Sequence, residues 1–322
     1  MTKARENSDY TGLQGDLAGL QTNITAGDTA ARAGRKNLIL NGDMQVNQRG
    51  ATSGITSGYF VDRFTLSSCS ASAVLTSSTP TEFPTAISVS ATSGNPIIFQ
   101  KIESKNCQGL SGKTVTVSFY AKNISNATTL YVKLQYAGSA DSFGSSTTIS
   151  EQNLGSLTSG WVKYTASWTV PAGGLNGLSL GILCAGAGTF TMGVTGVQME
   201  VGSVATDFEH RSYGETLADC QRYYFNSQGK TQGYGYQNGT TTMDMNVSLP
   251  VPMRANPSVT AHGSTYMWRQ NAYQSVSNPS CTSTNWNATK NTLYLFVQGY
   301  SNATNGWVAN SYFTRLEADA EL

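Results

Sequence analysis

Residues 197–225 read VQMEVGSVATDFEHRSYGETLADCQRYYF, and this stretch decides the fold. It begins as a strand, because apolar and polar residues alternate over 197–201. A polar turn follows, and then Ser212 with Glu215 three residues later forms a capping box that predicts the start of a helix. We interpret the stretch as the last strand of one domain, a hinge, and a linker helix over 213–225 that leads into the next domain.

The residues before this stretch alternate between apolar and polar with a period of two. The alternating runs cover 115–121, 130–135, 162–170, 178–182 and 190–194. Turns rich in Gly, Ser and Asn separate them, and no long helical pattern lies between them, which indicates antiparallel sheets packed face to face. We therefore predict one β-sandwich over 37–212, which is long enough to bury a substantial core.

Residues 226–322 predict a second, smaller β domain, so that the whole chain is all-β. Asn238-Gly239 lies between two polar runs and is typical of a type I′ hairpin turn. Alternate apolar residues over 243–253 predict a strand, and we place it at a sheet edge because Pro250 and Pro252 lack the N–H that a central strand requires.

Residues 1–36 are polar and small, with an apolar seam of Leu13, Leu17, Leu20 and Ile24. Their spacing of four, three and four is that of a coiled-coil interface, although glycines interrupt it. Two interpretations remain open: a short oligomeric stalk or attachment segment, or a flexible tail with chance leucines. Arg32, Arg35 and Lys36 favour a solvated basic linker.

Composition excludes several classes of protein. Only 12% of the 322 residues are charged and the net charge is +1, so the chain offers no field that would hold nucleic acid. No signal peptide and no membrane-spanning apolar run are recognisable, which predicts synthesis in a cytoplasm without export. An odd number of cysteines without a C-x-x-C pair favours buried free thiols: Cys69, Cys107, Cys184, Cys220 and Cys281.

The sequence does not predict an enzyme. Only two histidines exist, His210 and His262, and they are far apart. The GLSLG run matches a nucleophile elbow, but Ser179 lies within β alternation, whereas the elbow needs a following helix. Asp207 and Glu209 could form a carboxylate pair, but we interpret them as polar hinge groups that meet Arg211 or Arg222. A glycan depolymerase is disfavoured because no carboxylate-rich cluster exists.

Aromatic residues among uncharged polar ones mark the second domain. Sugar rings stack on aromatic faces while amides and hydroxyls bind their hydroxyl groups, so we predict a ligand site in its loops. The candidate ligand-binding residues are Tyr266, Trp268, Tyr273, Trp286, Tyr300 and Trp307. The alternative is that half of the rings fill the core or an oligomer interface. Single-stranded nucleic acid would need a basic groove, which the few nearby cations do not supply.

Several separated motifs resemble a domain common in bacteriophage tail-fibre and other virion proteins. They are NLILNGDM at 37–44, QRG at 48–50, YFVDRF at 59–64, LSGKTVTVSFYAK at 110–122, VQMEVGSVATDFE at 197–209, YGE at 213–215 and CQRYY at 220–224. The resemblance implies a jelly-roll sandwich similar to carbohydrate-binding modules. LPVPMR at 249–254 and ADAEL at 318–322 also resemble C-terminal domains of phage fibre-like proteins.

The same resemblance implies a structural calcium ion between the first turn and the last strand. Asn41 and Asp43 match the first part of that site, so they are the candidate metal ligands. The last strand departs from the pattern, since Thr195-Gly196 stand where an aspartate is usual. No other cofactor is expected.

The resulting hypothesis is a phage virion adhesion protein of the tail-fibre type. It would be a homo-oligomer, by the N-terminal seam and the resemblance a trimer, attached to other tail or capsid proteins through its N-terminus. Its C-terminal domain would bind a host-surface glycan or receptor, with no nucleic-acid partner. The alternative is a purely structural virion protein, such as a head decoration or tail subunit, in which the aromatic residues form interfaces.

Overall fold

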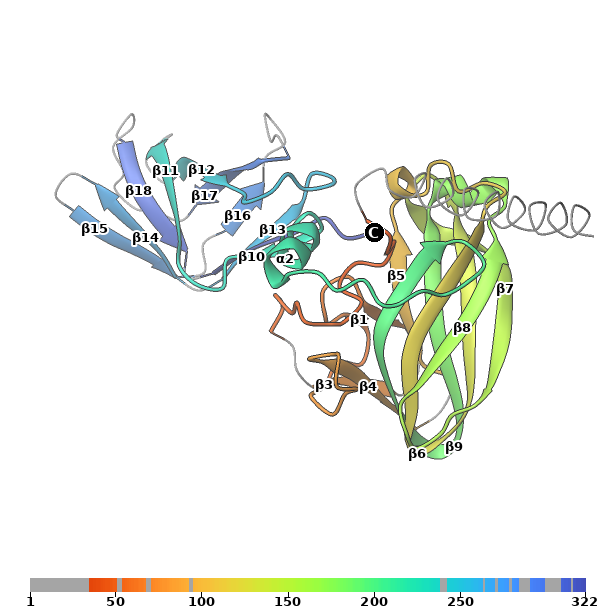
Figure 1. The fold of residues 1–322 in the computed structure, drawn as a ribbon. Helices are drawn as coiled ribbons and strands as arrows, with labels where there is room; N and C mark the ends of the chain where they lie inside the picture. Colours follow the sequence, from red (N-terminus) through yellow and green to blue (C-terminus); the bar gives the residue numbers. More distant parts are fainter. Residues whose placement is uncertain are drawn as a thin grey trace, which may run out of the picture.

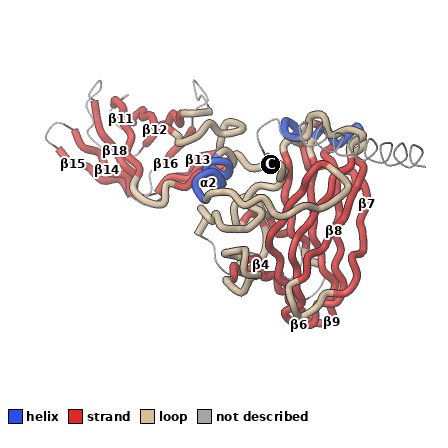
Figure 2. Tube along the Cα trace, viewed as in Figure 1, coloured by secondary structure: helices blue, strands red, loops and turns tan. Residues whose placement is uncertain are grey.

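The structure is a computed structural model that describes residues 35–50, 54–67, 71–92, 95–237, 242–262, 264–269, 272–277, 280–283, 290–298, 308–313 and 315–322. The described residues form an all-β fold of two units, with the helix α2 (Tyr213–Gln221) at their junction (Figures 1 and 2). The seam predicted within residues 1–36 lies outside the described residues, except for Arg35 and Lys36.

The first unit is an antiparallel β-sandwich of the jelly-roll type. Its nine strands are β1 (Gly58–Tyr59), β2 (Thr65–Ser67), β3 (Ala71–Thr76), β4 (Ala86–Ala91), β5 (Ile97–Ile102), β6 (Thr114–Ser139), β7 (Ser142–Ser156), β8 (Val162–Thr169) and β9 (Leu178–Val201). Two short 3₁₀ helices, η1 (Ser104–Asn106) and η2 (Ala172–Asn176), lie in its connections.

Two long strands, β6 and β9, pair with each other along most of their length and belong to both layers of the sandwich. The first part of β6 also pairs with β8, and its second part pairs with β7. The predicted alternation is confirmed, because Val115, Val117 and Phe119 are buried in register with the inner residues of β8 and β9. Alternate side chains of a strand point to opposite faces, so one face of each strand fills the core.

The C-terminal unit contains two antiparallel sheets. In the first, β19 (Arg315–Asp319) lies between β10 (Tyr224–Asn226) and β13 (Ser258–His262). The second has the order β15 (Ala272–Ser277), β14 (Ser264–Arg269), β18 (Val308–Phe313), β11 (Thr231–Gln237), β12 (Thr242–Ser248), β17 (Thr292–Gln298) and β16 (Ser280–Ser283). The predicted hairpin is present, because β11 pairs with β12, but Gln237 pairs with Met243, which leaves five residues between the paired positions where a two-residue type I′ turn would leave two. The turn itself lies outside the described residues.

Two local predictions need correction. The strand β12 pairs with both β11 and β17, so it is not an edge strand; it ends at Ser248, which places Pro250 and Pro252 beyond it. The capping box of α2 is confirmed, but the helix ends at Gln221 and Tyr224 already belongs to β10. The domain boundaries at 36, 212 and 225 stay predictions.

Candidate functional site

The structure describes three of the six aromatic residues that are predicted to bind a ligand. Trp286, Tyr300 and Trp307 lie outside the described residues. Tyr266 and Trp268 belong to β14, and Tyr273 belongs to β15, where its Cα is the antiparallel partner of Trp268. Three of the six positions are therefore brought onto neighbouring strands, and their role in binding stays a prediction.

Asn41 and Asp43, the candidate metal ligands, lie in the turn that begins the sandwich. The Asn41 side chain is committed to the backbone: its amide donates to the oxygens of Val46 and Asp62, at 2.9 and 3.0 Å, and its oxygen accepts from the Val46 N–H at 3.0 Å. Gln45 donates to the Asp43 carboxylate at 2.6 Å, and burial raises the pKa of that carboxyl. Calcium binding by these two residues stays a prediction.

The turn is closed against the last strand of the sandwich, β9. The Val197 N–H donates to the Gly42 oxygen at 2.9 Å, and the Asn37 amide donates to the Val197 oxygen at 3.2 Å. Thr195, which stands where the resemblance expects an aspartate, donates its hydroxyl to the oxygen of Thr85 at 2.7 Å. Gly42 and Asn37 therefore hold the first turn to Val197 of β9 through direct hydrogen bonds, whereas Thr195 bonds to Thr85 and not to the turn.

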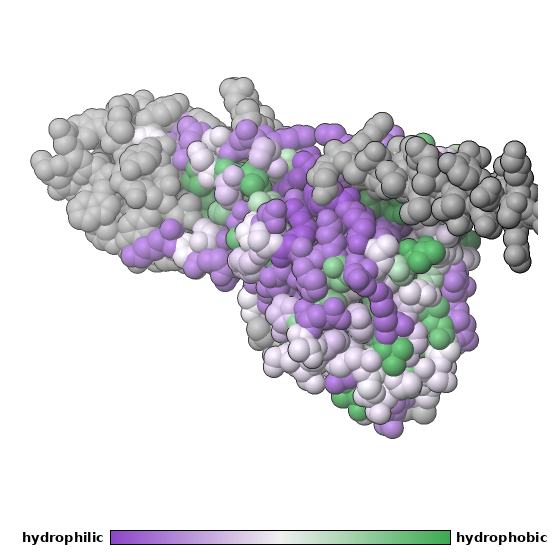
Figure 3. Space-filling model, viewed as in Figure 1, coloured by the Kyte–Doolittle hydropathy of each residue, from purple (hydrophilic) through white to green (hydrophobic). Residues whose placement is uncertain are grey.

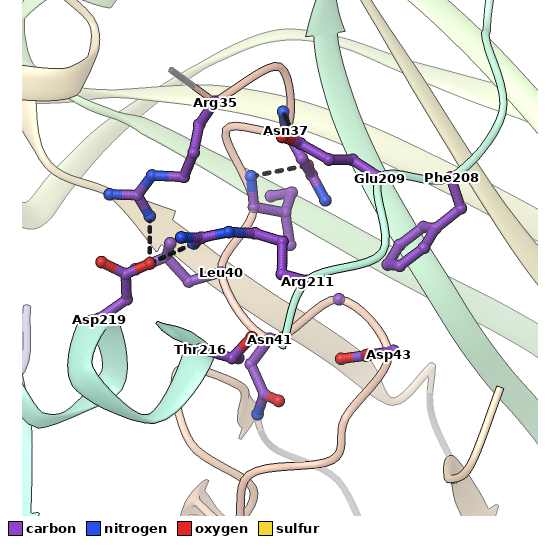
Figure 4. A pocket seen from close by; sticks show the side chains of 12 residues that line it. Arg35, Asn37, Leu40, Asn41, Asp43, Phe208, Glu209, Arg211, Thr216 and Asp219 are labelled. Carbon is purple, nitrogen blue, oxygen red and sulfur yellow. Dashed lines mark hydrogen bonds and ion pairs between the residues drawn. The ribbon is translucent and has the colours of Figure 1, made fainter. Parts of the chain in front are cut away.

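A pocket enclosing about 340 Å³, part of it open to solvent, lies beside this turn (Figure 4). Its walls come from three segments far apart in sequence: the opening residues 35–43, the hinge that follows β9, and the helix α2. Arg35 donates to the Asp219 carboxylate at 2.7 Å, and Arg211 pairs with the same oxygen. Glu209 accepts from the Asn37 N–H at 2.7 Å. The charged groups thus bind one another and fasten the hinge to the sandwich.

These contacts correct two predictions made from the sequence. Arg35 is not simply part of a solvated linker, because it pairs with Asp219, whereas Lys36 is exposed as predicted and donates to the Asp207 oxygen at 2.8 Å. Asp207 and Glu209 are not the partners of the two hinge arginines. Arg211 pairs with Asp219 instead, and Arg222 donates to the Glu103 carboxylate at 2.7 and 2.9 Å.

A second cluster of charged residues joins the two β units, and we name it the joint. Its centre is Arg63, which is 1% exposed and pairs with the Glu321 carboxylate from the C-terminal unit. Arg63 also donates to the Lys101 oxygen at 2.6 Å, and its guanidinium carbon lies 3.6 Å from the centroid of the Tyr223 ring. The C-terminal chain end lies at this junction beside β5 (Figure 1).

Arg49 is the second arginine of the joint. Its guanidinium lies over the Tyr224 ring at 3.7 Å and contacts three carboxylates, Asp62 at 3.2 Å and Asp319 and Glu321 at 3.5 Å each. A guanidinium satisfies several acceptors at once and stacks on aromatic rings, which suits Arg49 to this partly buried position.

Backbone hydrogen bonds complete the joint. The Ala320 N–H donates to the Tyr223 oxygen and the Arg254 N–H donates to the Arg222 oxygen, both at 2.8 Å. Tyr223 donates its hydroxyl to Glu103 at 3.2 Å. Around this region, the surface facing the viewer in Figure 3 is predominantly hydrophilic. Ion pairs and hydrogen bonds, with the buried rings of Tyr223 and Tyr224 beside them, thus fix the C-terminal unit to the sandwich.

Asp62 gives the joint a pH dependence. Burial is the largest influence on this carboxyl and outweighs the nearby Arg49, so its pKa rises to about 6 from 3.8. The folded state then holds the Asp62 proton more tightly than the unfolded state does. Between these two pKa values, therefore, this group makes the free energy of unfolding fall as the pH rises.

Asp62→Asn is expected to remove that dependence. A shift of about two pKa units corresponds to about 3 kcal/mol, so the wild type should lose about that much more stability than the variant between pH 3.5 and 7.5. Urea denaturation of both proteins across this range measures the difference. Parallel stability curves for the two proteins would show that Asp62 titrates normally.

The other residues considered for catalysis or metal binding are buried or are not grouped together. Ser179 lies inside β9, as the alternation predicts, with no helix following it. Cys107, Cys184 and Cys220 are buried free thiols, which confirms the prediction for these three, and burial raises the pKa of Cys107 and of Cys184 to about 12. Within the described ranges, no three His, Cys, Asp or Glu side chains are grouped to hold a metal ion. No described helix has the length and apolarity needed to cross a bilayer.

Comparison with known proteins finds no matching family model and no matching curated protein. Among solved structures, a domain of bacteriophage CBA120 tailspike protein 4 is 15% identical with a TM-score of 0.38, and the match covers 52% of this chain. It covers only 21% of that chain, so this protein matches about a fifth of it.

Two other solved structures are matched along their full length. A putative sugar-binding protein from Bacteroides thetaiotaomicron is 14% identical with a TM-score of 0.37, covering 52% of this chain and 100% of that one. The CBM22-1 xylan-binding domain of Paenibacillus barcinonensis Xyn10C is 12% identical with a TM-score of 0.37, covering 54% and 100%.

Proposed function

We propose that this chain is a non-catalytic recognition protein of a phage-type virion, which binds a host-surface glycan through its C-terminal unit. It acts as a homo-oligomer, by the sequence resemblance a trimer, and attaches to other virion proteins through its N-terminal segment. The observation that carries the proposal is the joint. A binding unit that is already held in one direction loses less conformational freedom when it binds a surface, and the joint supports such a fixed direction.

The use of charged residues supports a role without covalent chemistry. The buried carboxylates Asp62, Glu103 and Glu321 each pair with an arginine. A catalytic acid or base needs a carboxyl that meets the substrate. These three carboxyls instead meet guanidinium groups inside the protein.

A structural virion protein is the second candidate, and the same joint favours it, since a rigid spacer also needs its parts fixed together. The two candidates differ in whether the strands β14 and β15 contact a glycan. Deleting the C-terminal unit is a poor test because it removes Glu321 and leaves Arg63 buried without its partner. Point substitutions on β14 and β15 keep the joint intact.

The test uses the full chain carrying Trp268→Ala and Tyr273→Ala together, labelled and bound to host cells. Truncating aromatic residues at the centre of a binding site costs more than ~1 kcal/mol, so cell binding should weaken about tenfold or more. Tyr213→Ala is the matched control, because Tyr213 is 54% exposed on α2 and lies away from these strands.

Unchanged cell binding, together with impaired particle assembly, would favour the structural candidate. Release of new reducing ends from host polysaccharide by the wild-type protein would contradict both candidates and indicate a depolymerase.

A further inference from the structure

A second aromatic site lies on the sandwich itself, far from β14 and β15 in sequence. Trp161 directly precedes the strand β8, and its indole extends over the neighbouring strand to β9. The position of the indole follows from its distance to Gly193 on β9. A Cβ atom at Gly193 would lie 2.9 Å from Cη2 of Trp161 and 3.4 Å from Cγ of Lys122. Lys122 on β6 is the antiparallel partner of Gly193, so the glycine leaves space for both side chains.

Lys122 places a cation beside the ring. Its Nζ lies 5.0 Å from the centroid of the Trp161 ring and donates to the Ser78 hydroxyl at 3.2 Å. Among the described residues, no carboxylate lies within 4.0 Å of this Nζ, whereas Arg49, Arg63 and Arg222 of the joint each have one. Trp161 and Lys122 are both partly exposed, and Ile124 farther along β6 is 46% exposed. The ammonium group is therefore free to meet an anion.

Small hydroxyl side chains continue this surface across β9 and β4. Ser88 is the antiparallel partner of Gly193, and the hydroxyls of Ser90 and Thr191 lie 2.9 Å apart. All three side chains are partly exposed. The hinge covers the other end of the same sheet face, where Thr116 donates to the Gly202 oxygen at 2.7 Å.

We propose that Trp161 and Lys122 form a binding site for a carboxylate-bearing sugar residue within an acidic polysaccharide. The apolar face of the sugar ring stacks on the indole, the carboxylate pairs with the ammonium group of Lys122, and the serine and threonine hydroxyls bond to the hydroxyls of the adjoining sugar. This site goes beyond the proposed function, since it belongs to the sandwich and does not depend on the C-terminal aromatic residues.

The experiment titrates the full-length protein with two acidic oligosaccharides, a galacturonic acid oligomer and a sialic acid oligomer, and with a neutral galactose oligomer. Isothermal calorimetry measures the affinity and tryptophan fluorescence reports the indole. At least one acidic oligomer should bind more tightly than the neutral one, and its affinity should fall as salt rises because an ion pair is screened. Binding of the galacturonic acid oligomer would indicate a site for a uronate, and binding of the sialic acid oligomer would indicate a site for a nonulosonate.

Two variants assign the site. Trp161→Ala should weaken binding of the acidic oligomer about tenfold or more. Lys122→Met keeps the length of the side chain and should abolish the preference for acidic over neutral oligomers. Because Lys122 is partly exposed, this variant remains informative if Trp161→Ala fails to fold.

The control is the Trp268→Ala and Tyr273→Ala protein, which should bind the acidic oligomer as the wild type does. If the proposed function is wrong, this variant will bind host cells as well as the wild type does. If the present inference is wrong, the oligosaccharide titrations will show it. Wild-type protein that binds no acidic oligomer, or unchanged affinities in folded Trp161→Ala and Lys122→Met, would overturn the inference.

Discussion

Glu321→Ala is expected to lower the free energy of unfolding by about 3–5 kcal/mol, the usual cost of removing one partner of a buried ion pair. Arg63 would keep its charge at 1% exposure while losing its carboxylate, and Arg49 would lose one of its three carboxylate partners. Urea denaturation measures the loss. The C-terminal unit should also unfold separately from the sandwich, which would give two transitions instead of one.

The matched control is Glu151→Ala, which removes an exposed glutamate from β7 and should change stability by less than about 0.5 kcal/mol. Removing both charges, with Arg63→Met and Glu321→Met together, should cost less than Glu321→Ala alone because no unpaired charge remains buried. A loss below about 1 kcal/mol for Glu321→Ala would show that water reaches the joint and that Arg63 is solvated there.

Gly42→Ala is expected to destabilise the sandwich by about 3 kcal/mol, at the upper end of what overpacking costs. A Cβ atom on Gly42 would lie 2.0 Å from the backbone oxygen of Val197 and 3.3 Å from the Phe208 ring. Val197 belongs to the long strand β9, and the residues on either side of it, Thr195 and Gln198, pair with β6, so that Val197 cannot shift alone. The first turn would have to move away from β9 and lose the hydrogen bond between Val197 and Gly42.

Gly144→Ala provides the control, because a Cβ atom there would meet no atom within 4 Å. Thermal unfolding of the two variants beside the wild type measures the difference. Equal midpoints for Gly42→Ala and Gly144→Ala would contradict the close contact between the first turn and β9.

Local rules explain most of the fold. Alternation over 115–121 predicts a strand with one buried face because a β-strand has a side-chain period of two, and the structure confirms it. The capping box at Ser212 and Glu215 predicts where α2 begins, because it depends on residues three apart in sequence. Its end was missed because Tyr224 pairs with β19, a partner almost a hundred residues away.

The joint could not be predicted, although its residues stand in motifs that the sequence makes conspicuous. QRG contributes Arg49, YFVDRF contributes Asp62 and Arg63, and CQRYY contributes Tyr223. Each motif carries charge beside aromatic rings, but no rule of spacing relates positions 49, 63 and 321. Their convergence depends on how the C-terminal unit docks, which is a tertiary property. The aromatic residues predicted to bind a ligand did not point to Trp161 either, since its partner Gly193 is likewise distant in sequence.

The central claim is that the joint holds the C-terminal unit in one orientation on the sandwich. Double electron–electron resonance between spin labels at Lys105→Cys and Thr260→Cys, with Cys69 and Cys281 replaced by serine, tests it most directly. Both labelled positions are exposed, one on each unit, while Cys107, Cys184 and Cys220 are buried. We expect one narrow distance distribution, which broadens in Glu321→Ala. A broad distribution in the otherwise native protein would contradict the account.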